Sequence, residues 1–495
     1  MNKRKIDWPL IIIPILAVFG LSSFLGSSPK ASQSALMTIR HFLNQQFSAL
    51  YILVALFFVS SSLYVAFSKI GKLRLGDQND RPEYSNLRWG VMIFTSTMSA
   101  DIIFYSMCEW LMYDQEPFIK QKGNVMEWSL TYSLFHWGPI AWSFYIMLAV
   151  AFAYMLFVTK NNRQKFSEAC RPLLGKYIDG ITGKIIDLIA IFALIAGTAT
   201  TFSMSMPLLS TVVGNLLGIR QTKMLPIILI LIVVSIYLVA SVIGMKAISR
   251  LSTICYIFFI SLLLYILFFS NSFSYIIDAG VQGIGNLAQN FIGMATTTQS
   301  QGFTQNWTIY YWSYWIVWCV ATPFFIGSIS KGRTIKDVVL RGYAWGLGGT
   351  YLAFIVLSNF GMARQVHHLV NATKMVANGE SYAQVALKIM QTLPQYRIAL
   401  ILLALAMIGL YSTVFDSITM VISKYSYLRL DINEEPSKLM RGFWAIVFMI
   451  LPASLLINDN NMYNIQSVAI IAALPTMLVM VLIVVSFYKA VYYKK

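Results

Sequence analysis

The chain has 495 residues, of which 57% are apolar and only 12% charged, and its formal net charge is +17. Soluble domains do not have this composition, so the sequence indicates an all-α polytopic membrane protein. The four cysteines form no CxxC pair and the four histidines have no ligand spacing, so no disulfide, metal site or other cofactor is predicted.

Segments long enough to cross a bilayer follow one another along the chain. A spanning helix needs about 20 apolar residues, and twelve segments reach this length. They lie near 8–26, 48–68, 89–112, 128–158, 185–217, 224–245, 251–270, 307–329, 338–360, 397–423, 441–458 and 463–488. Segment 274–297 is only half apolar, which predicts an amphipathic helix in the membrane interface. The first apolar run lacks a signal-peptide cleavage site and is interpreted as a span.

Basic residues are unevenly divided between the loops. Of the 37 lysines and arginines, 27 lie in the termini and in loops that follow even-numbered spans, and 10 lie elsewhere. Cytoplasmic loops carry such an excess, so both termini are expected in the cytoplasm. The basic excess is then a result of topology, and a nucleic-acid partner is not expected.

In the third span, Asp101 lies in a stretch from Trp89 to Met107 that has no other charged residue. A carboxylate at this depth costs roughly 3 kcal/mol on insertion scales, and chains retain one where it faces a cavity, a partner or a cation. Four hydroxyl side chains precede it, at Thr95, Ser96, Thr97 and Ser99. Such hydroxyls satisfy backbone groups where a helix is interrupted. Asp101 is therefore predicted to be functional; the alternative is a structural residue bonded to these hydroxyls.

The eighth span contains an aromatic run from Trp307 to Trp318. One helix face collects the positions i, i+4, i+7 and i+11, namely Tyr311, Trp315, Trp318 and Thr322. In the fourth span Trp142 and Tyr145 share a face, and Gly138–Pro139 permits a bend that turns Trp137. A buried anion with a wall of indole and phenol rings is chemistry that recognises a quaternary ammonium group. The alternatives are an aromatic core or an interfacial belt.

Other buried polar residues have more modest interpretations. Glu109 lies eight residues after Asp101, and a structural role is favoured for it. Asp187 opens the fifth span, where a cap or the helix dipole explains it. Asp416 in the tenth span is either structural or part of an ion path. His136 is interpreted as a helix-packing residue rather than a proton relay.

At the tryptophan run the chain resembles the betaine/carnitine/choline transporter family along its whole length. The matching stretches are Asn306–Trp315, Ile329–Thr334, Tyr132–Pro139 and Ala151–Tyr154. The last two look especially like the carnitine/γ-butyrobetaine exchanger. The resemblance implies twelve spans in a bacterial cytoplasmic membrane and a homotrimer whose contact includes helix 274–297. It also implies two inverted five-helix repeats, spans 3–7 and 8–12. The expected units are 1–88 (two N-terminal spans), 89–270 (first repeat), 271–306 (interfacial helix and loop) and 307–495 (second repeat).

By position, the resemblance assigns the family's aromatic box to Trp137, Trp142, Tyr145, Tyr314, Trp315 and Trp318. Trp307 matches a tryptophan of the outer vestibule. The chain departs from the family pattern in several places. Where the family usually has W-x-W-W, this chain has Trp312-Ser-Tyr314-Trp315, so one box indole is a phenol. The Thr-Ser pair of sodium-coupled members is Thr413-Val414 here, and the exchanger's arginine that replaces sodium aligns near Cys255.

Asp101 aligns with a glycine of the betaine symporters and resembles the aspartate of proton-coupled choline transporters. Choline has a fixed positive charge and no carboxylate, whereas a betaine or carnitine brings a carboxylate that ionised Asp101 repels. The prediction is therefore a secondary transporter of choline or a close trimethylammonium compound, proton-coupled and sodium-independent, with no enzymatic activity. The alternative is a carnitine/γ-butyrobetaine or glycine betaine transporter, exchanger or symporter. A channel or a receptor is less favoured, because the sequence indicates neither the continuous polar pore that a channel needs nor a signalling domain.

Overall fold

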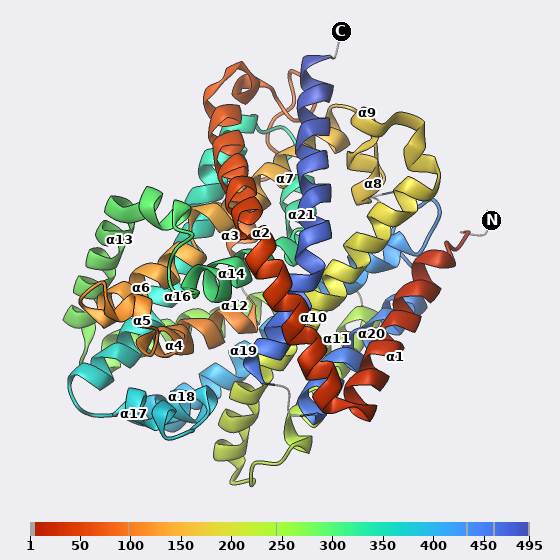
Figure 1. Cartoon of the computed structure of the whole chain (residues 1–495). Helices are drawn as coiled ribbons and strands as arrows, with labels where there is room; N and C mark the ends of the chain where they lie inside the picture. The colour runs from red at the N-terminus through yellow and green to blue at the C-terminus, as the bar shows by residue number, and fades with distance from the viewer. Residues whose placement is uncertain (1–4, 98, 244, 432–433, 459–460, 494–495) are drawn as a thin grey trace.

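The computed structural model describes residues 5–97, 99–243, 245–431, 434–458 and 461–493. Within these ranges the chain is a bundle of helices without a β-strand (Figure 1). The only extended pairings there are three isolated bridges, Ile6 with Tyr427, Arg74 with Thr334, and Arg163 with Asp431. Each bridge joins two segments for which the basic residues predict the same side of the membrane. The predicted all-α fold is confirmed.

The helices are, in chain order, α1 (Pro9–Ser27), α2 (Pro29–Phe67), α3 (Asn86–Thr97), α4 (Ala100–Asp114), α5 (Pro117–Lys120), α6 (Val125–His136), α7 (Pro139–Phe157), α8 (Phe166–Ala169), α9 (Arg171–Leu174), α10 (Ile181–Leu217), α11 (Met224–Ile243), α12 (Met245–Phe269), α13 (Phe273–Thr296), α14 (Ile309–Trp318), α15 (Thr322–Ser328), α16 (Ile335–Val366), α17 (Ala372–Ala377), α18 (Tyr382–Met390), α19 (Tyr396–Tyr425), α20 (Lys438–Ile457) and α21 (Met462–Tyr492). Short 3₁₀ turns lie at Lys69–Lys72 and Gly175–Asp179, and a π-turn at Thr304–Thr308 precedes α14.

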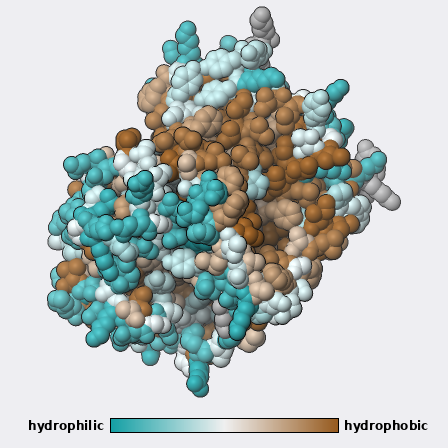
Figure 2. All heavy atoms as spheres, viewed as in Figure 1, coloured by the Kyte–Doolittle hydropathy of each residue, from teal (hydrophilic) through white to brown (hydrophobic). Residues whose placement is uncertain are grey.

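Eight helical segments within the described ranges, one of them α6 and α7 together as Val125–Phe157, are long and apolar enough to cross a membrane, or ten if each of two bent pairs forms one span. Figure 2 shows the matching surface, a broad area of hydrophobic side chains on the face that displays α2 and α21. The polytopic membrane fold is thereby confirmed. The count of twelve spans and the two inverted repeats remain predictions, because the third predicted span consists of two helices, α3 and α4, that are each too short to cross alone.

Three of the predicted spans are interrupted, and the interruptions position the site. The third span breaks between α3 and α4, where the serine and threonine cluster lies; the side chains at 95–98 lie outside the described part. The fourth is interrupted between His136 and Pro139, where a local bend is predicted, but α6 and α7 continue each other as one spanning helix, Val125–Phe157, without a bend of more than 40°. A Cβ on Gly138 would lie 2.3 Å from the Leu134 carbonyl oxygen, so the break needs glycine there. The eighth span bends by 50° between α14 and α15.

The predicted amphipathic segment 274–297 is the helix α13, and its helical nature is confirmed. It turns away from α12 by 112°. It packs against α6 and α16, at the left of Figure 1.

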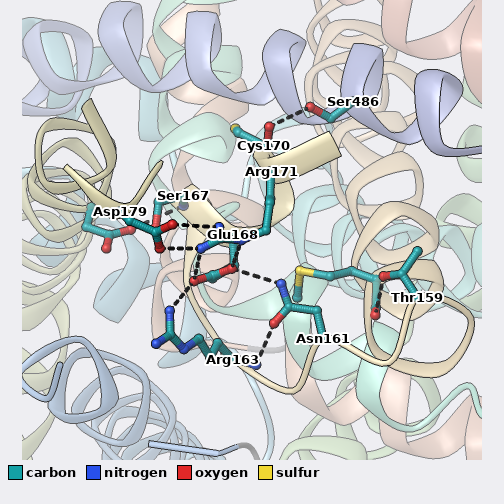
Figure 3. Close-up of polar contacts among 11 residues, drawn as sticks. Thr159, Asn161, Arg163, Ser167, Glu168, Cys170, Arg171, Asp179 and Ser486 are labelled. Carbon is teal, nitrogen blue, oxygen red and sulfur yellow. Dashed lines mark hydrogen bonds and ion pairs between the residues drawn. The ribbon is translucent and has the colours of Figure 1, made fainter. Parts of the chain in front are cut away.

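A polar network closes the connection between α7 and α10 against the C-terminal helix (Figure 3). The buried Glu168 carboxylate accepts hydrogen bonds from Arg171 Nε (2.7 Å), Asn161 Nδ2 (2.8 Å) and Arg163 Nη1 (2.5 Å). Arg171 also binds Asp179 with both terminal nitrogens, at 3.0 and 2.8 Å. From α21, the Ser486 hydroxyl donates to the Cys170 carbonyl at 3.2 Å. The charged groups thus hold the loop together, and the hydrogen bond from Ser486 ties it to α21.

We expect Glu168→Gln to lower the free energy of unfolding at pH 7 by about 2 kcal/mol. Burial raises the pKa of Glu168, but the hydrogen bonds from Arg171, Asn161 and Arg163 outweigh it and lower this pKa from 4.5 to about 2. The stabilisation is therefore complete above the unfolded-state pKa and is lost as the pH falls toward 2. Thermal unfolding in detergent, measured for both proteins from neutral to acidic pH, should show the difference shrinking. An equal difference at every pH would contradict the assignment.

Candidate functional site

A cavity of about 240 Å³ lies where the interrupted helices meet. Its wall includes six of the residues predicted for the site, Asp101, Trp137, Tyr145, Tyr314, Trp315 and Trp318. The remaining wall comes mainly from α12, α15 and α19. Among the described residues that line it, Asp101 and Asp416 are the only charged ones. Over the part of its wall that the structure describes, the cavity is therefore an apolar, ring-lined space with negative charge and no basic side chain.

Trp315 is the centre of the ring cluster. Its ring centroid lies 4.7 Å from Tyr145, 5.6 Å from Trp142 and 5.7 Å from Trp137. Trp142 is not among the residues that line the cavity, and it packs behind Trp315, so its expected contact with a ligand is indirect. Trp315 Nε1 is buried and has no hydrogen-bond partner in the described part of the chain. The cluster can therefore enclose a cation with ring faces, and it retains one unused donor.

Asp101 lies in the first turn of α4, directly after the break, and is 3% exposed. A helix N-terminus stabilises negative charge at this position. Its Oδ2 accepts a hydrogen bond from the Tyr314 hydroxyl, which also bonds to Thr201. Its Oδ1 has no partner among the described residues. The carboxylate is thus oriented by Tyr314 and still has one free oxygen.

The Asp101–Tyr314 contact links two departures from the family pattern. Sequence comparison identifies an aspartate in place of a glycine and a tyrosine in place of a tryptophan as separate differences. The structure joins them as one hydrogen-bonded pair, across α4 and α14. Their separation by more than 200 residues left no local signal for this contact.

On one side of the cavity, buried rings and acids fill the space. Glu109 accepts hydrogen bonds from Trp137 Nε1 (2.7 Å) and the Tyr113 hydroxyl (2.6 Å). His136 Nδ1 lies 2.7 Å from that hydroxyl, and its ring stacks on Tyr311 at 4.9 Å. Glu109 and His136 are both completely buried. A purely structural role for Glu109 does not include its hydrogen bond to Trp137, one of the predicted aromatic-box residues. This contact arises because α4 packs against α6.

Trp307 lies beyond this filled region. Its Nε1 donates to Glu116 at 2.7 Å, and its ring stacks on Tyr311 at 6.4 Å. It is not among the residues that line the cavity. In the opposite direction the cavity continues to Asp416 and Ser417 of α19, whose C-terminal end is followed by the Tyr427 bridge to Ile6. The region between the box residues and Trp307 is thus filled by side chains, whereas the cavity extends toward the end of the molecule that holds the N-terminal segment.

Two threonine hydroxyls near the cavity, on α10 and α19, could contribute to an ion site, and both bond to backbone. Thr198 donates to the Leu194 carbonyl at 2.7 Å, and Thr413 donates to the Leu410 carbonyl at 2.9 Å. Val414, which stands where sodium-coupled members have a hydroxyl, lines the cavity. Within the described ranges, no group of three or more His, Cys, Asp or Glu side chains could hold a metal ion.

Interrupted membrane helices around a central cavity are the architecture of a secondary transporter. Comparison with known proteins agrees: the profile of the BCCT, betaine/carnitine/choline family transporter, matches residues 9–495. The chain belongs to this family, so the predicted resemblance is confirmed, and it is a transporter rather than an enzyme.

Several named transporters are similar to the chain. A probable glycine betaine transporter of Desulfitobacterium hafniense is 28% identical over 90% of both chains. A carnitine transporter of Acinetobacter baumannii is 24% identical over 97% of this chain and 88% of its own length. An osmo-dependent choline transporter of Acinetobacter baylyi is 26% identical over 96% of this chain and 70% of its own. The names differ in substrate, so the choice between substrates depends on the residues of the cavity.

Proposed function

We propose that the protein is a secondary active transporter of a quaternary trimethylammonium compound, foremost choline, coupled to protons and independent of sodium. The observation that carries this is the free oxygen of Asp101 in a cavity lined by Tyr314 and Trp315. Each ring adds on the order of 1–2 kcal/mol to binding of a desolvated cation. The carboxylate balances the substrate's fixed charge.

The charge pattern favours choline over zwitterions. No lysine, arginine or histidine is found among the described residues of the wall, so a substrate carboxylate would meet Asp101 without a basic partner. Choline avoids this repulsion, and its hydroxyl oxygen can accept a hydrogen bond from the unused Trp315 Nε1. Proton and choline share one carboxylate, which gives a physical basis for coupling their movement.

The wider setting is part of the same proposal. We place the chain in a bacterial cytoplasmic membrane with both termini in the cytoplasm, as a homotrimer of twelve-span subunits. The bridges between the basic segments support a common side for them. Transport then occurs when one inverted repeat rocks against the other, so that the filled side opens as the hollow side closes.

Uptake of labelled choline into proteoliposomes tests the proposal. We expect an outward proton gradient, with the vesicle interior acidic, to raise uptake severalfold over the same vesicles without a gradient. A proton from the interior then occupies the carboxylate that choline has left and is carried outward on it. Vesicles without the protein are the control. Absence of choline uptake and of choline binding in the purified protein would refute the substrate assignment.

A carnitine or γ-butyrobetaine exchanger is the second candidate. It is supported by the sequence of Tyr132–Pro139 and by the unused Trp315 Nε1, which can donate to a carboxylate as well as to a hydroxyl. Vesicles preloaded with carnitine separate the two: an exchanger takes up labelled carnitine only against internal substrate, whereas a proton-coupled choline transporter needs no internal substrate.

We expect uptake to proceed without sodium. Val414 supplies no hydroxyl at a position where sodium-coupled members of the family have one, which leaves Thr198 and Thr413 as the remaining hydroxyls. Replacing sodium by potassium at constant pH and ionic strength should change the uptake rate by less than tenfold. A larger loss, equivalent to more than about 1.4 kcal/mol, would contradict this and indicate a sodium site at these threonines.

A further inference from the structure

The hollow end of the cavity contains a second carboxylate, that of Asp416 on α19. Its Oδ1 accepts a hydrogen bond from Arg441 Nη2 of α20. The Asp416 side chain is 16% exposed, whereas that of Arg441 is 3% exposed. Among the described residues, Arg441 is the hydrogen-bond donor to this carboxylate, and it binds Oδ1 rather than Oδ2. The acid therefore lies between the cavity and a guanidinium buried behind it.

Arg441 has a second partner in the same place. Its Nε donates to the Tyr237 hydroxyl at 3.3 Å, and its charge lies 5.9 Å from the centre of that ring. The Tyr237 hydroxyl is itself 2.5 Å from Thr419 Oγ1. Because a buried charge without partners is costly, this second set of contacts allows Arg441 to remain in place while Asp416 interacts with another cation.

The cavity also provides ring surface away from Trp315. Tyr256 and Phe259 of α12 and Phe325 of α15 line it. The hydroxyls beside Asp416 do not bond to it, since Thr413 and Ser417 donate to the carbonyls of Leu410 and Thr413. An acid with an oxygen that Arg441 does not bind, in a ring-lined space, suits the same chemical class of ligand as Asp101 does.

We propose that Asp416 is a second cation-binding position, which receives the quaternary ammonium group after it leaves Asp101. This inference rests on the proposed function and adds a step to it. The substrate and Arg441 compete for one carboxylate, so the position binds more weakly than Asp101. A weak intermediate position lets a cation cross the hollow part of the cavity without a fully uncompensated charge, and Arg441 prevents it from being trapped there.

Two single substitutions test the competition, using the full-length protein in proteoliposomes. Choline affinity is measured by tryptophan fluorescence, and exchange by counterflow of labelled choline. Asp416→Asn should leave the affinity within about threefold of wild type, because Asp101 dominates binding, but slow counterflow at least about tenfold. Arg441→Met should raise choline affinity at least about tenfold and also slow counterflow, since Arg441 then no longer competes with choline for Asp416. Counterflow at the wild-type rate in Asp416→Asn would overturn the inference.

The double variant Asp416→Asn with Arg441→Met removes both charges and excludes a purely structural explanation. Replacing both members of a buried ion pair often preserves stability. If the pair only ties α19 to α20, the double variant should exchange choline like wild type, which would overturn the inference even if the single variants fold poorly. We expect it to fold and to exchange slowly. Asp101→Asn separates the two proposals, because loss of choline binding there with normal exchange in the Asp416 variants would refute only the second position.

Discussion

Asp101→Asn should abolish choline uptake and remove the dependence of choline affinity on pH. Asparagine keeps the shape and can still accept a hydrogen bond from Tyr314, but it loses the charge that balances the substrate. The loss of a close ion pair in a partly desolvated site corresponds to on the order of 3 kcal/mol, or more than hundredfold in affinity. In wild type, choline affinity should fall as the pH is lowered, since the proton competes for the same carboxylate. Fluorescence titrations from about pH 5.5 to about pH 8.5 cover this competition.

Asp101→Gly should go further and favour zwitterions such as glycine betaine, because the repulsion of a substrate carboxylate is gone. Thermal unfolding of both variants controls for damage to the fold. If the asparagine variant binds choline like wild type with the same pH profile, then Asp101 is structural and the choline assignment loses its main support.

Trp315→Ala should abolish measurable binding of trimethylammonium compounds, whereas Trp315→Phe should retain part of it. The alanine variant loses the ring that contacts Tyr145 and Trp137 and leaves those rings without support. We expect a loss of at least about 2 kcal/mol, or roughly 30-fold in affinity. Fluorescence titration or direct binding of labelled choline measures the loss.

Trp312→Ala is the matched control for this experiment. Trp312 lies on the same helix and is equally buried, but it packs on Phe135 and is not among the residues that line the cavity. Its replacement should lower stability while the affinity for choline stays near the wild-type value. Equal affinity in the two alanine variants would remove Trp315 from the site.

The features that could be predicted from the sequence are those that depend on residues close together along the chain. The break before Pro139, the amphipathic helix α13 and the apolar spans each follow from local composition or periodicity. Trp315 and Trp318 lie together at the cavity because helical spacing alone sets their common face. The same spacing places Trp142 beside Tyr145, but it does not show that Trp315 would lie between Trp142 and the cavity.

Contacts between distant segments could not be predicted in this way. The bonds of Asp101 to Tyr314, of Glu109 to Trp137 and of Asp416 to Arg441 each join different helices. Sequence spacing identifies buried acids, because each is an exception in an apolar span, but it does not identify their partners. Partners are fixed by helix packing, which a single sequence does not report.

The hydrogen bond between Glu109 and Trp137 makes the Trp137 indole part of two structures at once. Trp137 forms part of the wall against which the substrate rests, and through Glu109 it also belongs to the packed barrier that includes Tyr113 and His136. The affinity for substrate and the rate at which the packed barrier opens therefore cannot be changed independently at Trp137. A substitution that raises substrate affinity by fixing the position of Trp137 will also slow the opening of the packed barrier. The variant with the highest affinity will therefore not be the one with the fastest transport.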